Sequence, residues 1–143
     1  MKLSEEWRGT KKQREALRAM FDGKCAYCGN VMDKMHADHV EPCIRVTRDP
    51  WGKPLEEPYM VKPEHNTVAN MMPACASCNL HKGGYHLEAW RDYLQRSADI
   101  LRRDTSTFRA GERFGIIAVD VRPIVFHFEQ VRAAAEALEQ RGL

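Results

Sequence analysis

Cysteine pairs are the clearest chemical feature of this sequence. Two C-x-x-C motifs occur, Cys25-Ala26-Tyr27-Cys28 and Cys75-Ala76-Ser77-Cys78. Four thiolates satisfy a tetrahedral Zn²⁺ ion, and a spacer of two residues lets each pair present both sulfurs from one tight turn or helix start. Such a site has no open coordination position, so the sequence predicts a structural zinc. A disulfide or redox function is the alternative, which nothing favours because no export signal is visible. The fifth cysteine, Cys43, is predicted to be a small buried apolar residue.

Candidate metal ligands and a candidate general base follow the two cysteine pairs. Asp38 and His39 end the segment that follows the first pair, and Asn79 directly follows the second. A hard divalent cation such as Mg²⁺ takes oxygen ligands, which the Asp38 carboxylate and the Asn79 carbonyl would supply. His39 could act as a general base near neutral pH. Strand alternation would place Asp38 and His39 on opposite faces, so this site requires the chain to bend at Glu41-Pro42.

Each of these residues also has a purely structural explanation. Asp38 could cap a turn, His39 could be a surface histidine, and Asn79 could be an ordinary helix residue before Gly83-Gly84. These explanations weaken when the residues are taken together, because a zinc module that only binds a partner has no need for all of them.

The combination of motifs resembles the HNH nucleases of the ββα-metal, or His-Me finger, group. The matching residues fall within about residues 14–94: Cys25-x-x-Cys28-Gly29, Asp38-His39 with Pro42, Asn70, and Cys75-x-x-Cys78-Asn79-x-x-Lys82-Gly83. Any single piece is weak, whereas their joint occurrence in this order is specific. Asn79 stands at the third signature position in place of histidine, a variant that the family also accommodates. Residues 44–68 form a longer segment than a minimal member needs.

The resemblance implies a metal-dependent phosphodiesterase that acts on DNA. His39 would activate water for attack on phosphorus, while Asp38 and Asn79 would hold one divalent ion, such as Mg²⁺, Mn²⁺ or Ni²⁺, on the scissile phosphate. Asn70 would hold the loop that carries the histidine by side-chain hydrogen bonds. Cleavage would leave a 5′-phosphate and a 3′-hydroxyl. Small HNH proteins occur in phages, mobile elements and restriction systems, so a phage or mobile-element protein is a candidate partner.

Basic residues that could contact DNA phosphates are concentrated near the first cysteine pair. Residues 8–24 hold six basic and two acidic side chains, although the whole chain has a net charge of only +2. Ordinary solvated charge explains such a run as well as phosphate binding does. The predicted DNA contacts are Lys82, Arg14, Arg18, Arg45 and Arg48.

Local patterns predict the elements that carry these residues. Thr10 as N-cap with Gln13 three residues on, and Gly23 as a stop, predict a helix over residues 11–22. Residues 44–68 contain four prolines and are predicted to be irregular apart from short strands. The further predicted elements are a strand or short hairpin over 31–40, strands over 44–47 and 59–62, a short helix that ends at Gly83-Gly84, and a long helix over 87–102 whose core stripe is Leu87, Trp90, Leu94, Ala98 and Leu101.

The predicted fold class is α+β. It consists of a small zinc-stapled ββα-metal core with an N-terminal helix, a following long helix and a C-terminal extension. Residues 1–104 are predicted to form the nuclease domain, with its core at about 24–84 between helices 11–22 and 87–102. Residues 105–143 are predicted to contain a β-hairpin over 114–121 and 124–128 and a terminal helix over 129–141. This extension either packs on the core or forms an interface.

The size and composition of the chain limit the class of protein to which it can belong. The chain has 143 residues, 43% of them hydrophobic and 29% charged, which suits one modest globular domain and argues against disorder or membrane insertion. No signal peptide is visible, so we expect a cytoplasmic protein, in the host if the gene belongs to a phage. The competing function is a non-catalytic zinc module that binds nucleic acid or protein.

Overall fold

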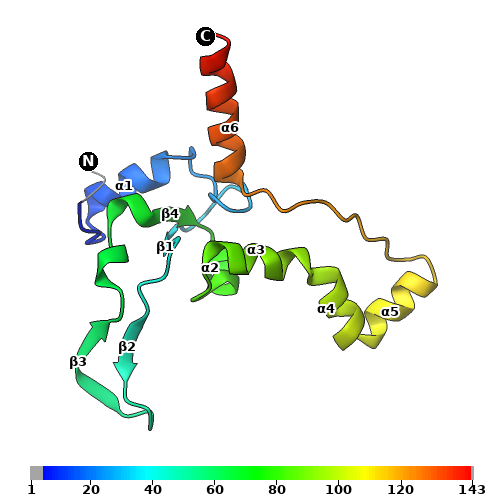
Figure 1. Ribbon diagram of the computed structural model, residues 1–143, viewed down its shortest axis with the longest axis horizontal. Coiled ribbons are helices and arrows are strands. Elements are labelled where there is room, and N and C mark those ends of the chain that lie inside the picture. Colours follow the sequence, from blue (N-terminus) through cyan, green and yellow to red (C-terminus); the bar gives the residue numbers. More distant parts are fainter. Residues whose placement is uncertain (1–4, 143) are drawn as a thin grey trace. The chain divides into compact units, whose positions relative to one another are not determined.

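The computed structural model describes residues 5–142, which belong to two compact units. The first unit comprises Met1–His86 and Phe126–Leu143, and the second comprises Leu87–Val125. The first unit contains every element that positions the candidate site (Figure 1). Its elements are α1 (Lys11–Ala19), β1 (His36–His39), β2 (Arg45–Arg48), β3 (Pro54–Met60), the short 3-10 turns η1 (Pro63–His65) and η2 (Val68–Asn70), β4 (Met71–Ala74), α2 (Ala76–Lys82) and α6 (His127–Gln140).

Helix α1 begins where the capping residue predicts. The Thr10 hydroxyl accepts a hydrogen bond from the Gln13 amide at 3.2 Å. The helix ends at Ala19 and not at Asp22, so the predicted end was wrong by about one turn. Asp22 and Gly23 both have positive φ angles, of 52° and 77°, and such left-handed residues cannot continue a right-handed helix.

A strand pair followed by a helix forms the centre of the first unit. Strand β1 pairs antiparallel with β4, with His36 opposite Ala74 and His39 opposite Met71. All four residues of β4 are buried, and β4 leads through Cys75 into α2. The predicted mixed α+β fold with a cysteine cluster is therefore confirmed. Of the predicted strand over 31–40, only His36–His39 are paired as a strand, apart from one isolated bridge at Val31.

A β-hairpin interrupts the chain between β1 and β4. Strands β2 and β3 pair with each other alone and reach away from the β1–β4 pair (Figure 1). The prediction for β2 is confirmed within one residue, whereas the second strand begins at Pro54 and ends at Met60 instead of covering 59–62. Both Pro54 and Pro58 fit in β3 because a two-stranded sheet leaves one edge of each strand without ladder hydrogen bonds.

Aromatic side chains pack the start of α6 against the turn that contains Cys25 and Cys28. The Tyr27 ring lies 5.5 Å from that of Phe126 and 6.3 Å from that of Phe128, centroid to centroid. The amides of His127 and Phe128 donate to the carbonyls of Tyr27 and Ala26. The compact units consequently do not follow the predicted boundary after residue 104. Beyond Glu129, the described residues of α6 are exposed.

The second unit is helical up to Arg113 and irregular where the sequence predicted a hairpin. It contains α3 (Leu87–Gln95), α4 (Ser97–Asp104) and α5 (Ser106–Arg113), and no residue described after Ala74 lies in a strand. The predicted strands over 114–121 and 124–128 were wrong. Two side chains of α3 instead donate hydrogen bonds to backbone carbonyls of this segment. Arg91 donates to the Ile124 carbonyl at 2.8 Å, and Gln95 donates to the Arg122 carbonyl at 2.9 Å.

The predicted long helix over 87–102 is also interrupted. Arg96, with φ −91° and ψ 8°, separates α3 from α4. Trp90 is the one buried member of the predicted core stripe, and Leu101 is 42% exposed, so the stripe is not a continuous core. None of the helices described over residues 5–142 combines the length and apolar character needed to cross a bilayer.

Candidate metal centre and adjoining cavity

The four cysteines of the two C-x-x-C motifs converge on one point. Their Sγ atoms all lie within 4.8 Å of one another, and the Cys28 and Cys75 sulfurs are 3.9 Å apart. Zinc–sulfur bonds of about 2.3 Å in a tetrahedron would place the sulfurs about 3.8 Å apart, so the cluster is close to the size that Zn²⁺ requires. The prediction of a four-cysteine metal site is confirmed, and Cys43 is buried as predicted.

Local structure brings each pair of sulfurs together. Cys25 and Cys28 lie in the tight turn after α1, where the Gly29 amide donates to the Cys25 carbonyl at 2.9 Å. Cys75 is the N-cap of α2 and its sulfur accepts from the Cys78 amide at 3.4 Å. The Cys78 thiol also lowers the pKa of Cys25 to about 4 by hydrogen bonding to it, and the same bond raises the pKa of Cys78. The cluster therefore favours one thiolate before any metal binds, and the metal has only the remaining protons to displace.

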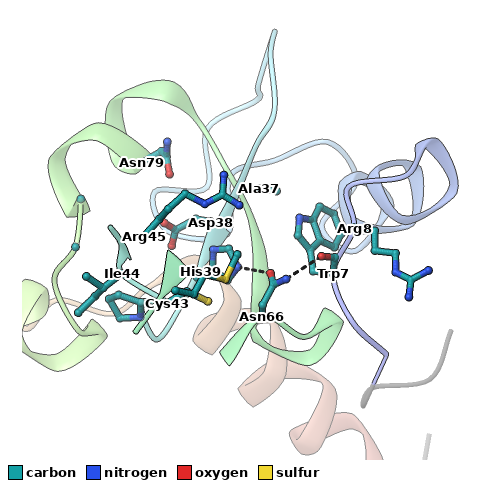
Figure 2. Close-up of a pocket in the computed structure, with 14 residues that line it drawn as sticks. Trp7, Arg8, Ala37, Asp38, His39, Cys43, Ile44, Arg45, Asn66 and Asn79 are labelled. Carbon is teal, nitrogen blue, oxygen red and sulfur yellow. Dashed lines mark hydrogen bonds between the residues drawn. The ribbon is translucent and has the colours of Figure 1, made fainter. Parts of the chain in front are cut away.

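An open cavity of about 650 Å³ lies on the β1–β4–α2 unit. It is lined by Asp38, His39, Asn79 and Arg45 among other residues, so the structure brings the predicted oxygen ligands and the predicted base to one place (Figure 2). Asp38 and His39 both reach the cavity because β1 ends at His39 and the chain turns directly afterwards. The side-chain amide of Asn79 and the Arg45 guanidinium make no hydrogen bond to any described residue, which leaves both groups available to a ligand.

Two buried side chains, Tyr27 and Lys82, contact the Asp38 carboxylate. Its Oδ2 accepts from the Tyr27 hydroxyl at 2.5 Å and lies 3.2 Å from Lys82 Nζ. Asp38 is only 6% exposed. Burial raises the pKa of its carboxyl, while the Tyr27 hydrogen bond and the Lys82 charge oppose that rise. No described residue bonds to Oδ1, so this oxygen is the one that a cation could take.

Lys82 was predicted wrongly as a DNA contact. Its side chain is completely buried, and Nζ donates to the His39 carbonyl at 2.8 Å in addition to its ion pair with Asp38. The sequence placed Lys82 correctly on the helical face of Asn79, but that end of α2 faces the interior. A buried ammonium that is already paired cannot reach a phosphate outside.

Two asparagines surround His39 in different ways. Asn66 Oδ1 lies 2.9 Å from Nε2 of the His39 ring. The Asn70 side chain bonds to the backbone of the turn after His39 and of η1: Nδ2 donates to the carbonyls of Glu41 and His65, and Oδ1 accepts from the Glu41 amide, all at 2.8–3.0 Å. Asn70 thus fixes the chain that follows His39, while Asn66 contacts the imidazole itself.

No family model, curated protein or solved structure matches this chain.

Of the four remaining predicted DNA contacts, one lines the cavity and three do not. Arg45 lines the cavity, and Arg48 lies in the hairpin, where it donates to the Gly52 carbonyl at 2.8 Å. Arg14 and Arg18 are exposed on α1, and each donates to a backbone carbonyl in the segment before β1. These two line a separate shallow depression and not the cavity that holds Asp38.

Tyr27 and Asn66 are site residues that sequence reasoning missed. Tyr27 stands inside the first C-x-x-C motif, where the spacer signalled only metal geometry. Asn66 lies in the proline-rich segment, which has no periodic pattern to mark an inward-facing side chain. Each makes its contact to a residue distant in sequence, so no local rule could have found it.

Proposed function

We propose that this chain is an HNH-type, metal-dependent DNA phosphodiesterase. The observation that carries the proposal is the single cavity shared by Asp38, His39 and Asn79, beside a four-cysteine metal cluster on the same strand–strand–helix unit. A carboxylate, an imidazole and an amide with free donor or acceptor atoms form a set that phosphodiester hydrolysis needs.

The donor atoms at the cavity suit a hard cation. Asp38 Oδ1 and the Asn79 side-chain oxygen have no partner among residues 5–142, and Mg²⁺, Mn²⁺ or Ni²⁺ could take both as ligands while keeping water and phosphate oxygens in the other positions. When bound, such an ion neutralises charge on the scissile phosphate and the leaving oxygen. Because Lys82 already offsets the charge of Asp38, we expect the protein alone to bind the cation weakly and to bind it better with a DNA phosphate present.

His39 is the proposed general base. It takes a proton from the attacking water as the new oxygen–phosphorus bond forms and the bond to the 3′-oxygen of the leaving strand breaks, and that oxygen takes a proton from solvent water. The products are then a 5′-phosphate and a 3′-hydroxyl. Asn70 keeps the turn after His39 in place, and the buried pair of Tyr27 and Lys82 keeps Asp38 from rotating.

DNA would reach the cavity over a partly basic surface. Arg45 and Arg8 line the cavity, and Arg48 extends the positive charge along the hairpin. Arg14 and Arg18 on α1 are further candidate phosphate contacts, although their bonds to backbone carbonyls also give them a structural role. Phosphate contacts of this kind predict affinity that falls steeply with salt.

The decisive test is cleavage of supercoiled plasmid by zinc-loaded protein with Mg²⁺, Mn²⁺ or Ni²⁺. We expect the wild type to nick or linearise the plasmid and His39→Ala to lose at least about 100-fold in rate, the lower range for general-base catalysis. His81→Ala is the matched control, because His81 is exposed on α2 and lies outside the cavity. A wild type that cuts nothing with any of the three ions, or a His39→Ala variant as active as the wild type, would refute the proposal.

A non-catalytic zinc module that binds nucleic acid is the second candidate. The ion pair between Asp38 and Lys82 favours it, because this carboxylate is already neutralised inside the protein and needs no metal. DNA binding that is unchanged by divalent ions and never followed by cleavage would select this candidate.

A further inference from the structure

The hydrogen bonds around Asn66 determine which nitrogen of His39 carries a proton. Asn66 Nδ2 donates to the Trp7 carbonyl at 3.1 Å, and a carbonyl can only accept (Figure 2). The amide oxygen of Asn66 therefore faces His39, 2.9 Å from Nε2. Because an amide oxygen also only accepts, the donor in this contact must be an Nε2–H group of the ring.

Asn66 is held firmly enough to impose this arrangement. Its backbone carbonyl accepts from the Trp7 amide at 3.0 Å, so main chain and side chain both pair with Trp7. Its own amide donates to the Pro63 carbonyl at 3.0 Å at the end of η1. A side chain anchored at these points cannot turn its amide over without losing a hydrogen bond.

We infer that Asn66 is a positioning residue that keeps the neutral His39 ring in the Nε2–H form and directs its only lone pair to Nδ1. No described residue bonds to Nδ1, and the ring lines the cavity, so this lone pair is free to accept a proton from water. The inference rests on the proposed function. It assigns ring control to Asn66, whereas Asn70 controls the backbone that carries the ring.

The test combines a spectroscopic readout with turnover, on the full zinc-loaded chain. The ring N–H proton of His39 is observed by ¹H–¹⁵N NMR at a pH where the imidazole is neutral, with no other divalent ion added. A hydrogen-bonded ring proton is protected from exchange with water and gives a signal. The variants are Asn66→Ala, which removes the acceptor, and Asn66→Asp, which keeps an acceptor for His39 but loses the donor to Trp7. Asn30→Ala is the matched control, because Asn30 is exposed and outside the cavity.

The expected result is a His39 ring signal in the wild type, in Asn66→Asp and in Asn30→Ala, and its loss in Asn66→Ala. In DNA cleavage, Asn66→Ala should lower kcat by roughly 10- to 100-fold with little change in KM, the usual effect of losing a partner that orients a reactive group. Asn66→Asp should recover most of that loss.

Two results would overturn the inference. One is a protected ring proton and normal kcat in Asn66→Ala. The other is a folded Asn66→Asp variant that keeps the ring signal yet is as impaired in kcat as Asn66→Ala, since the loss of rate would then not follow the ring proton. A wild type that shows the ring signal but cuts no DNA would refute the nuclease proposal and leave the assignment of the ring proton intact.

Discussion

At the scale of single residues, Lys82 is a buried lysine that stabilises the fold through its ion pair with Asp38. Replacing it by methionine leaves the buried Asp38 carboxylate without its ion-pair partner, which typically costs about 3 kcal/mol or more. We expect Lys82→Met to lower the free energy of unfolding by about that amount, measured by denaturant titration. Lys11→Met is the control, because Lys11 lies exposed on α1 and should change stability by no more than about 0.5 kcal/mol. Equal stability of the two variants would contradict the buried pair.

Tyr27 sets the pH at which Asp38 can hold a cation. Burial raises the pKa of Asp38, and the Tyr27 hydroxyl opposes that rise by donating to the ionised form. Binding of Mn²⁺ in the presence of DNA should therefore fall on acidification at a higher pH than an ordinary aspartate predicts, and Tyr27→Phe should move this acidic limb to still higher pH. Mn²⁺ binding as a function of pH measures the shift, in the His39→Ala background so that the proposed base does not contribute. Tyr59→Phe, on the exposed hairpin, should leave the limb in place, and a Tyr27→Phe profile that does not move would exclude Asp38 as the titrating ligand.

At the scale of elements, the β2–β3 hairpin presents a rigid tip. Asp49 Oδ1 accepts from the amides of Trp51 and Lys53, and Arg48 donates to the Gly52 carbonyl. Trp51 projects from this turn and is 88% exposed. The base of the hairpin lines the cavity through Arg45 and Met60, so DNA in the cavity would also meet the hairpin.

We expect Trp51→Ala to weaken DNA binding about tenfold, because an aromatic ring stacked on a base contributes about 1–3 kcal/mol. The stability should hardly change, since the side chain is exposed. Fluorescence anisotropy with a labelled duplex and the inactive His39→Ala background gives the affinity. Phe114→Ala truncates another exposed aromatic residue, in the second unit, and serves as the control. Affinities that stay equal in both variants would remove the hairpin tip from the DNA-binding surface.

At the scale of the whole molecule, the cluster of four cysteines brings together segments that are distant in sequence. It connects the turn after α1 to the start of α2, and the aromatic contacts of Tyr27 extend that junction to Phe126 and Phe128. A small domain gains much of its stability from such a structural metal.

Removal of the metal should accordingly unfold the first unit. We expect Cys75→Ala to lower the midpoint of thermal unfolding by roughly 10 °C or more, which corresponds to about 3 kcal/mol in a chain of this size. Cys43→Ala should have a much smaller effect, because Cys43 is buried but lies outside the cluster. Circular dichroism against temperature, before and after chelation, measures both. A Cys75→Ala variant that melts like Cys43→Ala would show that the cluster holds no structural metal.

The sequence located the parts of the site that are carried by short motifs. The two C-x-x-C pairs, Asp38-His39 and Asn79 needed only their spacing and order, because a turn or one helix start fixes the geometry within each motif. The same local rules found the terminal helix but failed for residues 114–128. β-branched residues predicted strands there, but a strand forms only when a partner supplies its hydrogen bonds, and Arg91 and Gln95 supplied them from a helix instead.

By itself, the sequence determined that this protein is a mixed helix-and-strand chain with a four-cysteine metal site and with Asp38, His39 and Asn79 beside it. Only the tertiary structure decided how those groups are used. It placed Lys82 behind Asp38 instead of at the surface, brought Tyr27 to the same carboxylate, and set Asn66 against the His39 ring. The physical reason is that burial and hydrogen-bond partners depend on contacts between segments distant in the chain, which no local pattern of residue types encodes.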